Sequence, residues 1–107
     1  MKRYGSLIKI KLDKLEEYKK LHKNIWPEVA KTINECNIKN YSIFYKDGYL
    51  FSYFEYTGNN YDSDMKKMAD DPVTQKWWDI CKPMQEPLQT RKEGEWWAEM
   101  EEVFHQD

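Results

Sequence analysis

The side chains best suited to chemistry in this 107-residue sequence are one histidine and the aromatic residues around it. His22 follows Tyr18 by four positions, and a helix brings residues at that spacing to one side. An imidazole exchanges protons near neutral pH because its unperturbed pKa is about 6.5. The pair therefore predicts acid–base catalysis on one bound molecule. Spacing alone leaves an alternative open, in which His22 is a core residue hydrogen-bonded to a backbone carbonyl.

Three further aromatic residues, Tyr41 and the adjacent Trp77 and Trp78, are candidates for binding a ligand. Phe, Trp and Tyr make up 16% of the chain, more than a core of this size requires. Rings with an apolar body and a polar tip suit a partner subunit or a sugar. Neighbours on a helix point about 100° apart, so at least one of the two tryptophans is expected to line a groove. Ordinary packing is the alternative for all three.

Several classes of chemistry find no support in the sequence. It contains no glycine-rich phosphate motif, and neither His22 nor His105 lies in a metal-binding spacing. No G-x-S-x-G segment indicates a hydrolase. Cys36 and Cys81 lie far apart and form no C-x-x-C pair, which predicts neither a disulfide nor a thiolate metal site. We therefore expect no cofactor and no metal.

Charge and hydropathy limit the partners. The net charge is −2, from 17 basic and 19 acidic residues that are interspersed along the chain. This pattern argues against nucleic acid and anionic membranes as partners. No run of about 20 apolar residues could span a bilayer, and the first residues do not resemble a signal peptide. We expect a soluble, cytoplasmic protein with reduced cysteines.

The first part of the chain predicts a strand followed by a broken helix. Three apolar residues, Ile8, Ile10 and Leu12, alternate with two lysines, which predicts a half-buried strand over about residues 4–12. Asp13 and Glu16 resemble a capping box. The residues that then recur at spacings of three and four are Leu15, Tyr18, His22, Ile25, Val29, Ile33 and Cys36. Pro27 interrupts this stripe and predicts a break near residues 23–26, with Pro27 opening the second half.

Residues 40–56 predict a hairpin around Asp47-Gly48, a dipeptide typical of a type I′ turn. That register places Tyr41, Ile43, Tyr45, Leu50, Ser52 and Phe54 on one face, and Ser42, Phe44, Tyr49, Phe51 and Tyr53 on the other. Both faces are too apolar to be left in water. The chain's own helices can cover one face, and the other needs a lined cavity or a second subunit, which favours a dimer.

The second half predicts two helical segments and a last strand. A turn at residues 58–60 precedes a helix over Tyr61–Ala69, and Asp71 then caps a helix that begins with Pro72. The expected buried stripe is Val73, Trp77, Ile80 and Met84, with Trp78 and Cys81 flanking it. Residues 85–95 are expected to form an exposed loop, and residues 96–105 a strand.

The resulting order is β-α-β-β-α-β. It predicts an α+β fold of the ferredoxin-like type, with an antiparallel sheet and helices on one face. We expect one domain over residues 1–107.

Residues 17–28 read EYKKLHKNIWPE and resemble the E-Y-x-x-x-H-x-x-I-W-P-E signature of the L-rhamnose mutarotase family. Further matches to that family follow in register at residues 40–43 (NYSI), 71–78 (DPVTQKWW) and 100–105 (MEEVFH). The resemblance spans nearly the whole chain. It implies a dimeric α/β barrel in which two ferredoxin-like subunits pack sheet to sheet.

The resemblance also implies an activity and a site. The family consists of cofactor-free isomerases that exchange the α and β anomers of a monosaccharide. Its proton donor falls on His22, and its sugar-binding residues fall on Tyr18, Tyr41, Trp77 and Trp78. We expect L-rhamnose or a related 6-deoxyhexose as the substrate.

Anomer exchange opens the hemiacetal ring, turns the aldehyde by half a turn and closes the ring on its other face. As a hypothesis, His22 donates a proton to the ring oxygen while Tyr18 and Tyr41 bind hydroxyl groups. Trp77 or Trp78 would cover the apolar face of the sugar. The general base stays open between a carboxylate, a tyrosine and water. Two other functions also stay open: a cofactor-free monooxygenase on the same dimeric barrel, and a non-catalytic sugar-binding domain.

Overall fold

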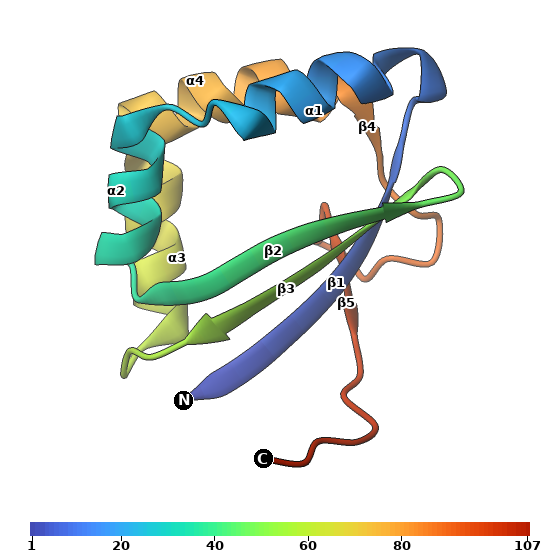
Figure 1. The fold of residues 1–107 in the computed structure, drawn as a ribbon. Coiled ribbons are helices and arrows are strands. Elements are labelled where there is room, and N and C mark those ends of the chain that lie inside the picture. Colours follow the sequence, from blue (N-terminus) through green and yellow to red (C-terminus); the bar gives the residue numbers. More distant parts are fainter.

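The computed structural model describes all 107 residues and contains one antiparallel sheet (Figure 1). Its strands are β1 (Lys2–Ile10), β2 (Ile38–Lys46), β3 (Tyr49–Tyr56), β4 (Gln85–Glu86) and β5 (Ala98–Met100). The strand order is β2-β3-β1-β4, and β5 also pairs with β1. Every pairing is antiparallel, so the α+β, ferredoxin-like order predicted from the sequence is confirmed.

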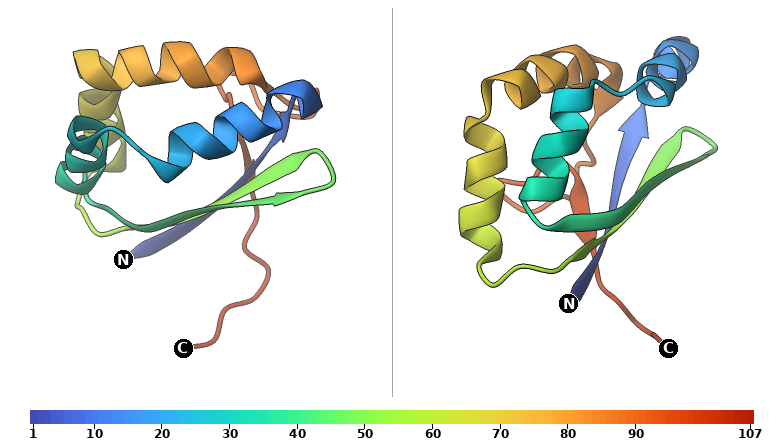
Figure 2. Two further views of the ribbon diagram at one scale, coloured as in Figure 1. Left: turned by 45° about the horizontal axis from the view of Figure 1, so that its top comes forward. Right: turned by 60° about the vertical axis from the view of Figure 1, so that its left-hand side comes forward.

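The helices lie on one face of this sheet (Figures 1 and 2). They are α1 (Leu15–Lys23), α2 (Pro27–Glu35), α3 (Tyr61–Asp70) and α4 (Pro72–Cys81), with short 3-10 turns at η1 (Leu12–Lys14) and η2 (Lys82–Met84). In both views α1 and α4 run side by side over one end of the sheet, while α2 and α3 descend beside each other at its other end. No helix is both long and apolar enough to cross a membrane.

The hairpin formed by β2 and β3 agrees with the prediction. Asp47 and Gly48 both have positive φ, 50° and 87°, which is the backbone of a type I′ turn. Tyr45 pairs with Leu50 and Phe44 with Phe51, so the two predicted faces are present. Leu50 is buried under the helices, whereas Phe44 is 64% exposed on the other side. We call the side of the sheet that lacks helices the outer face.

The break between α1 and α2 also agrees with the sequence, but one residue of the predicted stripe is wrong. The helix ends at Lys23 and Pro27 is the first residue of α2. Because the link is not helical, the periodicity is interrupted and Ile25 is exposed. Trp26 packs against the core in its place. The predicted capping box is also wrong, because Asp13 lies inside η1 and α1 begins two residues later without a side-chain cap.

In α4 the predicted cap is present and the buried stripe is rotated. The Asp71 carboxylate accepts hydrogen bonds from the Thr74 backbone N–H at 2.9 Å and from its hydroxyl at 2.8 Å. Because its hydroxyl is hydrogen-bonded, Thr74 can be buried. Cys81, on the same side of the helix two turns later, is also buried. Ile80, which was expected in the core, is 37% exposed. The helix is therefore turned slightly from the orientation that the apolar residues alone predict.

The ends of the chain differ most from the sequence prediction. The first strand is Lys2–Ile10 rather than 4–12, and Leu12 is exposed in η1. The expected loop over 85–95 instead starts with β4, whose Gln85 pairs with Ile10 and is buried. The last strand covers only Ala98–Met100, and residues 101–107 are exposed. A two-residue strand has too few positions for a periodic signal, and the acidic pair 101–102 has no burial to favour a strand.

The main core lies between the sheet and helices α1, α2 and α4. Its buried members are Ile8, Ile10, Tyr18, Val29, Leu50, Trp77, Cys81 and Met84. A smaller cluster of Tyr4, Ile38 and Tyr56 lies at the other end of the sheet, beside α3. Two of the predicted site residues, Tyr18 and Trp77, are thus also core residues, so the site is built on packed elements rather than on loops.

Ile8 tests this assignment of the core, because it is fully buried at the centre of β1. We predict that Ile8→Ala lowers the free energy of unfolding by about 2–5 kcal/mol through lost burial and a cavity. The control Ile80→Ala, on the exposed side of α4, should cost less than about 1 kcal/mol. Urea unfolding followed by tryptophan fluorescence at one fixed protein concentration measures both. Equal losses would contradict the assignment.

Candidate active site

His22 lies in the last turn of α1, and its ring is held by the preceding turn of the same helix. Its Nδ1 is 2.9 Å from the backbone carbonyl oxygen of Tyr18. The two rings stack with centroids 4.0 Å apart and planes inclined by 26°. A carbonyl oxygen can only accept, so Nδ1 carries the proton and Nε2 of the neutral ring carries a lone pair. His22 is thus hydrogen-bonded to a backbone carbonyl, as expected of a core histidine. Its Nε2, however, has no hydrogen-bond partner in the protein.

A tryptophan ring from α4 contacts the imidazole, and a second one, from the link after α1, contacts the first. Trp77 meets His22 edge to face, with centroids 5.2 Å apart. Trp26 meets Trp77 in the same manner, also at 5.2 Å. Trp77 is buried, so it both fills the core and walls the histidine. Trp26 belongs to the same group of rings, although the sequence analysis assigned it no role.

Burial sets the protonation states of the pair. It lowers the pKa of His22 below the usual 6.5, and the hydrogen bond to the Tyr18 carbonyl opposes this only in part. At neutral pH the imidazole is therefore mainly uncharged. Burial raises the pKa of the Tyr18 hydroxyl well above its usual value, opposed by a hydrogen bond from Gln85. The phenol thus keeps its proton, and a neutral hydrogen-bonding group stands beside a neutral base.

Tyr41 approaches this region from β2. Burial of its hydroxyl raises the pKa to about 12, although the residue as a whole is 43% exposed. The Tyr41 ring meets that of Phe54 edge to face, with centroids 5.5 Å apart. Tyr41 and Cys81 each add to the raised pKa of Tyr18, which places their polar atoms near its hydroxyl. Burial raises the pKa of the Cys81 thiol to about 11, so it is an unreactive neighbour.

Trp78 lies one residue further round α4 and has different neighbours from Trp77. It is half-buried, and Lys82 Nζ lies 5.3 Å from its ring centroid. The same ammonium lies 5.6 Å from the ring centroid of Trp96. The structure therefore brings Tyr18, His22 and Trp77 into direct contact. Trp78 lies at the edge of that group, with no ring contact to His22.

Two residues that the sequence analysis did not select complete the group. Gln85 is 6% exposed, and its Nε2 donates to the Tyr18 hydroxyl at 3.0 Å. The Trp96 indole Nε1–H donates to Gln85 Oε1 at 2.8 Å. No sequence signal separates this glutamine from the polar residues that follow it. Trp96 is one of five Trp residues, and its neighbours in the sequence do not indicate that it bonds to the site.

No acidic side chain is among the groups that shift the pKa of His22, Tyr18 or Tyr41. No group of three or more His, Cys, Asp or Glu side chains is placed to hold a metal ion. The chemistry available here is therefore that of one neutral imidazole, two phenols and the faces of indole rings. Such a group can bind a ring with an apolar face and polar edges, and it can move a proton at Nε2.

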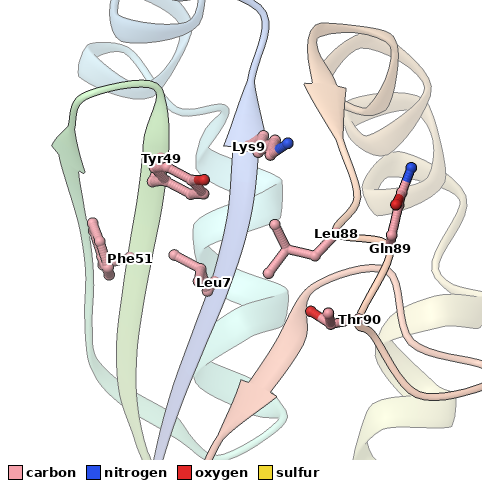
Figure 3. Close-up of a pocket in the computed structure, with 7 residues that line it drawn as sticks. All are labelled: Leu7, Lys9, Tyr49, Phe51, Leu88, Gln89 and Thr90. Atoms are coloured by element: carbon pink, nitrogen blue, oxygen red, sulfur yellow. The ribbon is translucent and has the colours of Figure 1, made fainter.

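A separate pocket lies on the outer face (Figure 3). It has a volume of about 460 Å³ and is lined by Leu7, Lys9, Tyr49, Phe51, Leu88, Gln89 and Thr90. The figure shows these side chains on the side of β1 and β3 away from the helices. None of the predicted site residues lines it. Its lining has no histidine and no acidic side chain, so we place the candidate chemistry at His22 instead.

The chain is similar in sequence to proteins of one family. The family model for L-rhamnose mutarotase matches residues 3–106. The L-rhamnose mutarotase of Bacillus subtilis (strain 168) is 40% identical over 86 residues, which are 78% of this chain and 80% of that protein. The L-rhamnose mutarotase of Oceanobacillus iheyensis is 34% identical over 115 residues, with both chains fully covered.

A solved structure is also similar in fold. The crystal structure of an L-rhamnose mutarotase from Formosa agariphila superposes with a TM-score of 0.79 at 22% identity, and each chain is fully covered. The sheet and its helix layer are thus a known arrangement.

The histidine geometry is directly measurable. We predict that the His22 imidazole titrates with a pKa below 6.5, because burial disfavours its charged form. In its neutral form the proton should be on Nδ1, because Nδ1 faces the Tyr18 carbonyl oxygen, which can only accept a hydrogen bond. Long-range ¹H–¹⁵N NMR spectra recorded between pH 4.5 and 8 report both properties. A pKa above 6.5, or a proton on Nε2 in the neutral ring, would contradict the geometry.

Proposed function

The chain belongs to the L-rhamnose mutarotase family, and we propose that it exchanges the α and β anomers of L-rhamnose with His22 as the group that transfers the proton. One observation carries the role of His22. Its Nδ1 is bonded to the Tyr18 carbonyl, which leaves the Nε2 lone pair free beside aromatic walls. An imidazole oriented in this way is ready to accept a proton and to return it.

The proton balance of ring opening fits a single imidazole. Neutral Nε2 accepts the proton of the anomeric hydroxyl, and the electrons left on that oxygen form the carbonyl as the bond from C1 to the ring oxygen breaks. The imidazolium then gives its proton to the ring oxygen. Both oxygens are bonded to C1, so one nitrogen can serve both with a small shift of the sugar. After the aldehyde turns, the same steps in reverse close the other anomer.

The absence of a nearby carboxylate favours this single-group scheme. No acidic residue shifts the pKa of His22 or Tyr18, so in this chain Nε2 is the strongest base at the site. Tyr18 and Tyr41 would bind sugar oxygens through their neutral hydroxyls. Trp77 and Trp78 would cover the apolar face of the ring and its 6-methyl group. Trp77 is buried and contacts His22, whereas Trp78 is half-buried and has no ring contact with His22.

The other functions open at the outset are not favoured by the comparisons. The family model describes L-rhamnose mutarotases, and both relatives reported above are named as such. Mutarotases are isomerases. A non-catalytic sugar-binding domain would need no free imidazole nitrogen. The geometry at Nε2 therefore supports catalysis over binding alone.

We further propose that two copies pack through their outer faces into a homodimer. Phe44 is 64% exposed and Phe51 is 36% exposed on this face, and no helix covers it. The two residues pair with each other across β2 and β3. An apolar sheet face of this kind is stable in water only when another surface covers it. A second copy offers a complementary apolar surface by symmetry.

The remaining assignments follow the same proposal. Residues 1–107 would act as one mutarotase domain that binds a monosaccharide. Both cysteines are unpaired and buried, which fits a reducing, cytoplasmic location.

His22→Asn tests the proposed chemistry. We predict that it slows enzyme-catalysed exchange of L-rhamnose anomers by about 10²- to 10⁴-fold, because the proton-transfer group is gone. Saturation-transfer NMR between the two anomeric proton signals measures the exchange rate. The matched control His105→Asn changes the other histidine, in the exposed tail, and should leave the rate unchanged. Full exchange in His22→Asn would refute the assignment.

The same scheme fixes the pH dependence. Neutral His22 starts the reaction, so kcat/KM should be flat near pH 7 and fall on the acid side, with an apparent pKa below 6.5. Exchange rates between pH 5 and 8, corrected for the uncatalysed rate at each pH, measure this profile. A corrected rate that rises steadily as the pH drops from 7 to 5 would show that the imidazolium, not the neutral ring, starts the reaction.

Phe44→Glu tests the dimer, because it places a charge on the apolar outer face, where Phe44 is 64% exposed. We predict that the mass in solution falls from twice 13.1 kDa to 13.1 kDa as the interface is lost. Light scattering after size-exclusion chromatography measures the mass. Leu12→Glu, at a residue that is 70% exposed in η1, is the control and should stay dimeric. A wild-type chain that is monomeric at micromolar concentration would refute the proposed dimer.

A further inference from the structure

A buried hydrogen-bond chain connects the segment after α4 to the hydroxyl of Tyr18. Gln85 is 6% exposed, on the short strand β4 beside Ile10. Its amide binds Trp96 at one end and Tyr18 at the other, at 2.8 Å and 3.0 Å. Both partners lie in or next to the main core, so the amide cannot exchange these bonds for bonds to water.

The direction of every hydrogen bond in this chain is determined by its first member. An indole N–H can only donate, so the carbonyl end of the Gln85 amide must face Trp96. The NH₂ end must then face Tyr18, and the Tyr18 oxygen accepts from it. A phenol oxygen that accepts from Gln85 keeps its own O–H to donate elsewhere. This is the only hydrogen bond of the Tyr18 hydroxyl in the structure, so its proton has no acceptor within the protein.

Trp96 is itself held in place. Lys82 Nζ lies 5.6 Å from the Trp96 ring centroid and 5.3 Å from that of Trp78, so one ammonium contacts both indoles. Such contacts with tryptophan faces are attractive. Trp96 also packs against the main core. The orienting donor is therefore fixed by the protein and does not depend on a ligand.

We propose that Gln85, oriented by Trp96, is a positioning residue that makes Tyr18 a hydrogen-bond donor to an oxygen lone pair of the sugar. The inference rests on the proposed function and assigns a direction to one of its contacts. A ring oxygen or an anomeric oxygen can accept from a phenol, and both gain negative charge as the proton moves through His22. Gln85 acts only through the phenol, because its two polar ends are occupied by Tyr18 and Trp96.

Gln85→Glu is the sharpest test, because it keeps the shape and reverses the direction. An ionised carboxylate cannot donate, so Tyr18 would give its O–H to Glu and lose it for the sugar. We expect kcat/KM for L-rhamnose anomer exchange to fall by about 10- to 100-fold at pH 8.5. Burial at position 85 raises the pKa of a carboxyl group there, so toward pH 6 the loss should shrink, because a protonated carboxyl group donates as the amide does. Gln106→Glu adds the same charge in the exposed tail and should match wild type at each pH.

A double-mutant cycle separates this role from damage to the fold. In a Tyr18→Phe background the change Gln85→Glu should have little further effect at pH 8.5, because the hydroxyl through which it acts is absent. Far-UV and near-UV circular dichroism check that each variant is folded. Gln85→Met, which has neither donor nor acceptor, should also be slower than wild type. It should show no dependence on pH beyond that of wild type.

The outcomes distinguish failure of the proposed function from failure of the role proposed for Gln85. If wild-type protein fails to accelerate exchange, the proposed function fails. If wild type is active and loses activity in His22→Asn, the function stands and the Gln85 variants decide the inference alone. Equal rates for wild type and Gln85→Glu at every pH from 6 to 9 would overturn it. So would an equal fold-loss from Gln85→Glu with and without the Tyr18 hydroxyl.

Discussion

The hydrogen bond between His22 Nδ1 and the Tyr18 carbonyl is the constraint on which the rest of the site depends. It joins a side chain to the backbone of its own helix one turn earlier, at 2.9 Å. The bond fixes which nitrogen is protonated and leaves the other without a hydrogen-bond partner in the protein. Burial then keeps the ring uncharged at neutral pH. A backbone carbonyl thus orients the imidazole, a task that a carboxylate performs in many other proteins.

The neighbouring helix ends place aromatic rings beside His22. Pro27 ends the first helical segment soon after His22, and the non-helical link lets Trp26 turn back onto Trp77. Asp71 and Pro72 start α4 at the position from which Trp77 reaches the imidazole. Tyr18 is 4% exposed and belongs to the core. Core packing and the proposed site therefore use the same side chains, and the packed elements hold those side chains in place.

Much of this arrangement could be predicted from local patterns. The Asp47-Gly48 turn, the break at Pro27 and the Asp71 cap each depend on a few neighbouring residues, and all three are present. Patterns that need tertiary contacts were less well predicted. Ile80 is exposed because the satisfied hydroxyl of Thr74 could take the buried position, and periodicity does not register a satisfied polar group.

Gln85 is the part of the site that sequence patterns could not predict. A single buried amide has no periodicity, and its importance comes from partners 67 and 11 residues away in the sequence. The Tyr18 and His22 pair was predictable because i and i+4 residues meet on any helix. The direction of the hydrogen bonds around that pair was not, since it is set by a tryptophan from the far end of the chain.

The central claim is that the sugar binds at His22 and not in the pocket on the outer face, and the position of bound sugar tests it directly. Sugar should bind between α1 and α4, while the pocket on the outer face contains no proton-transfer group. Titration of L-rhamnose into ¹⁵N-labelled protein, followed by backbone and side-chain NMR signals, locates the binding site. The account predicts that the His22 imidazole and the Trp77 indole shift most. Shifts confined to Leu88, Gln89 and Thr90 would contradict it.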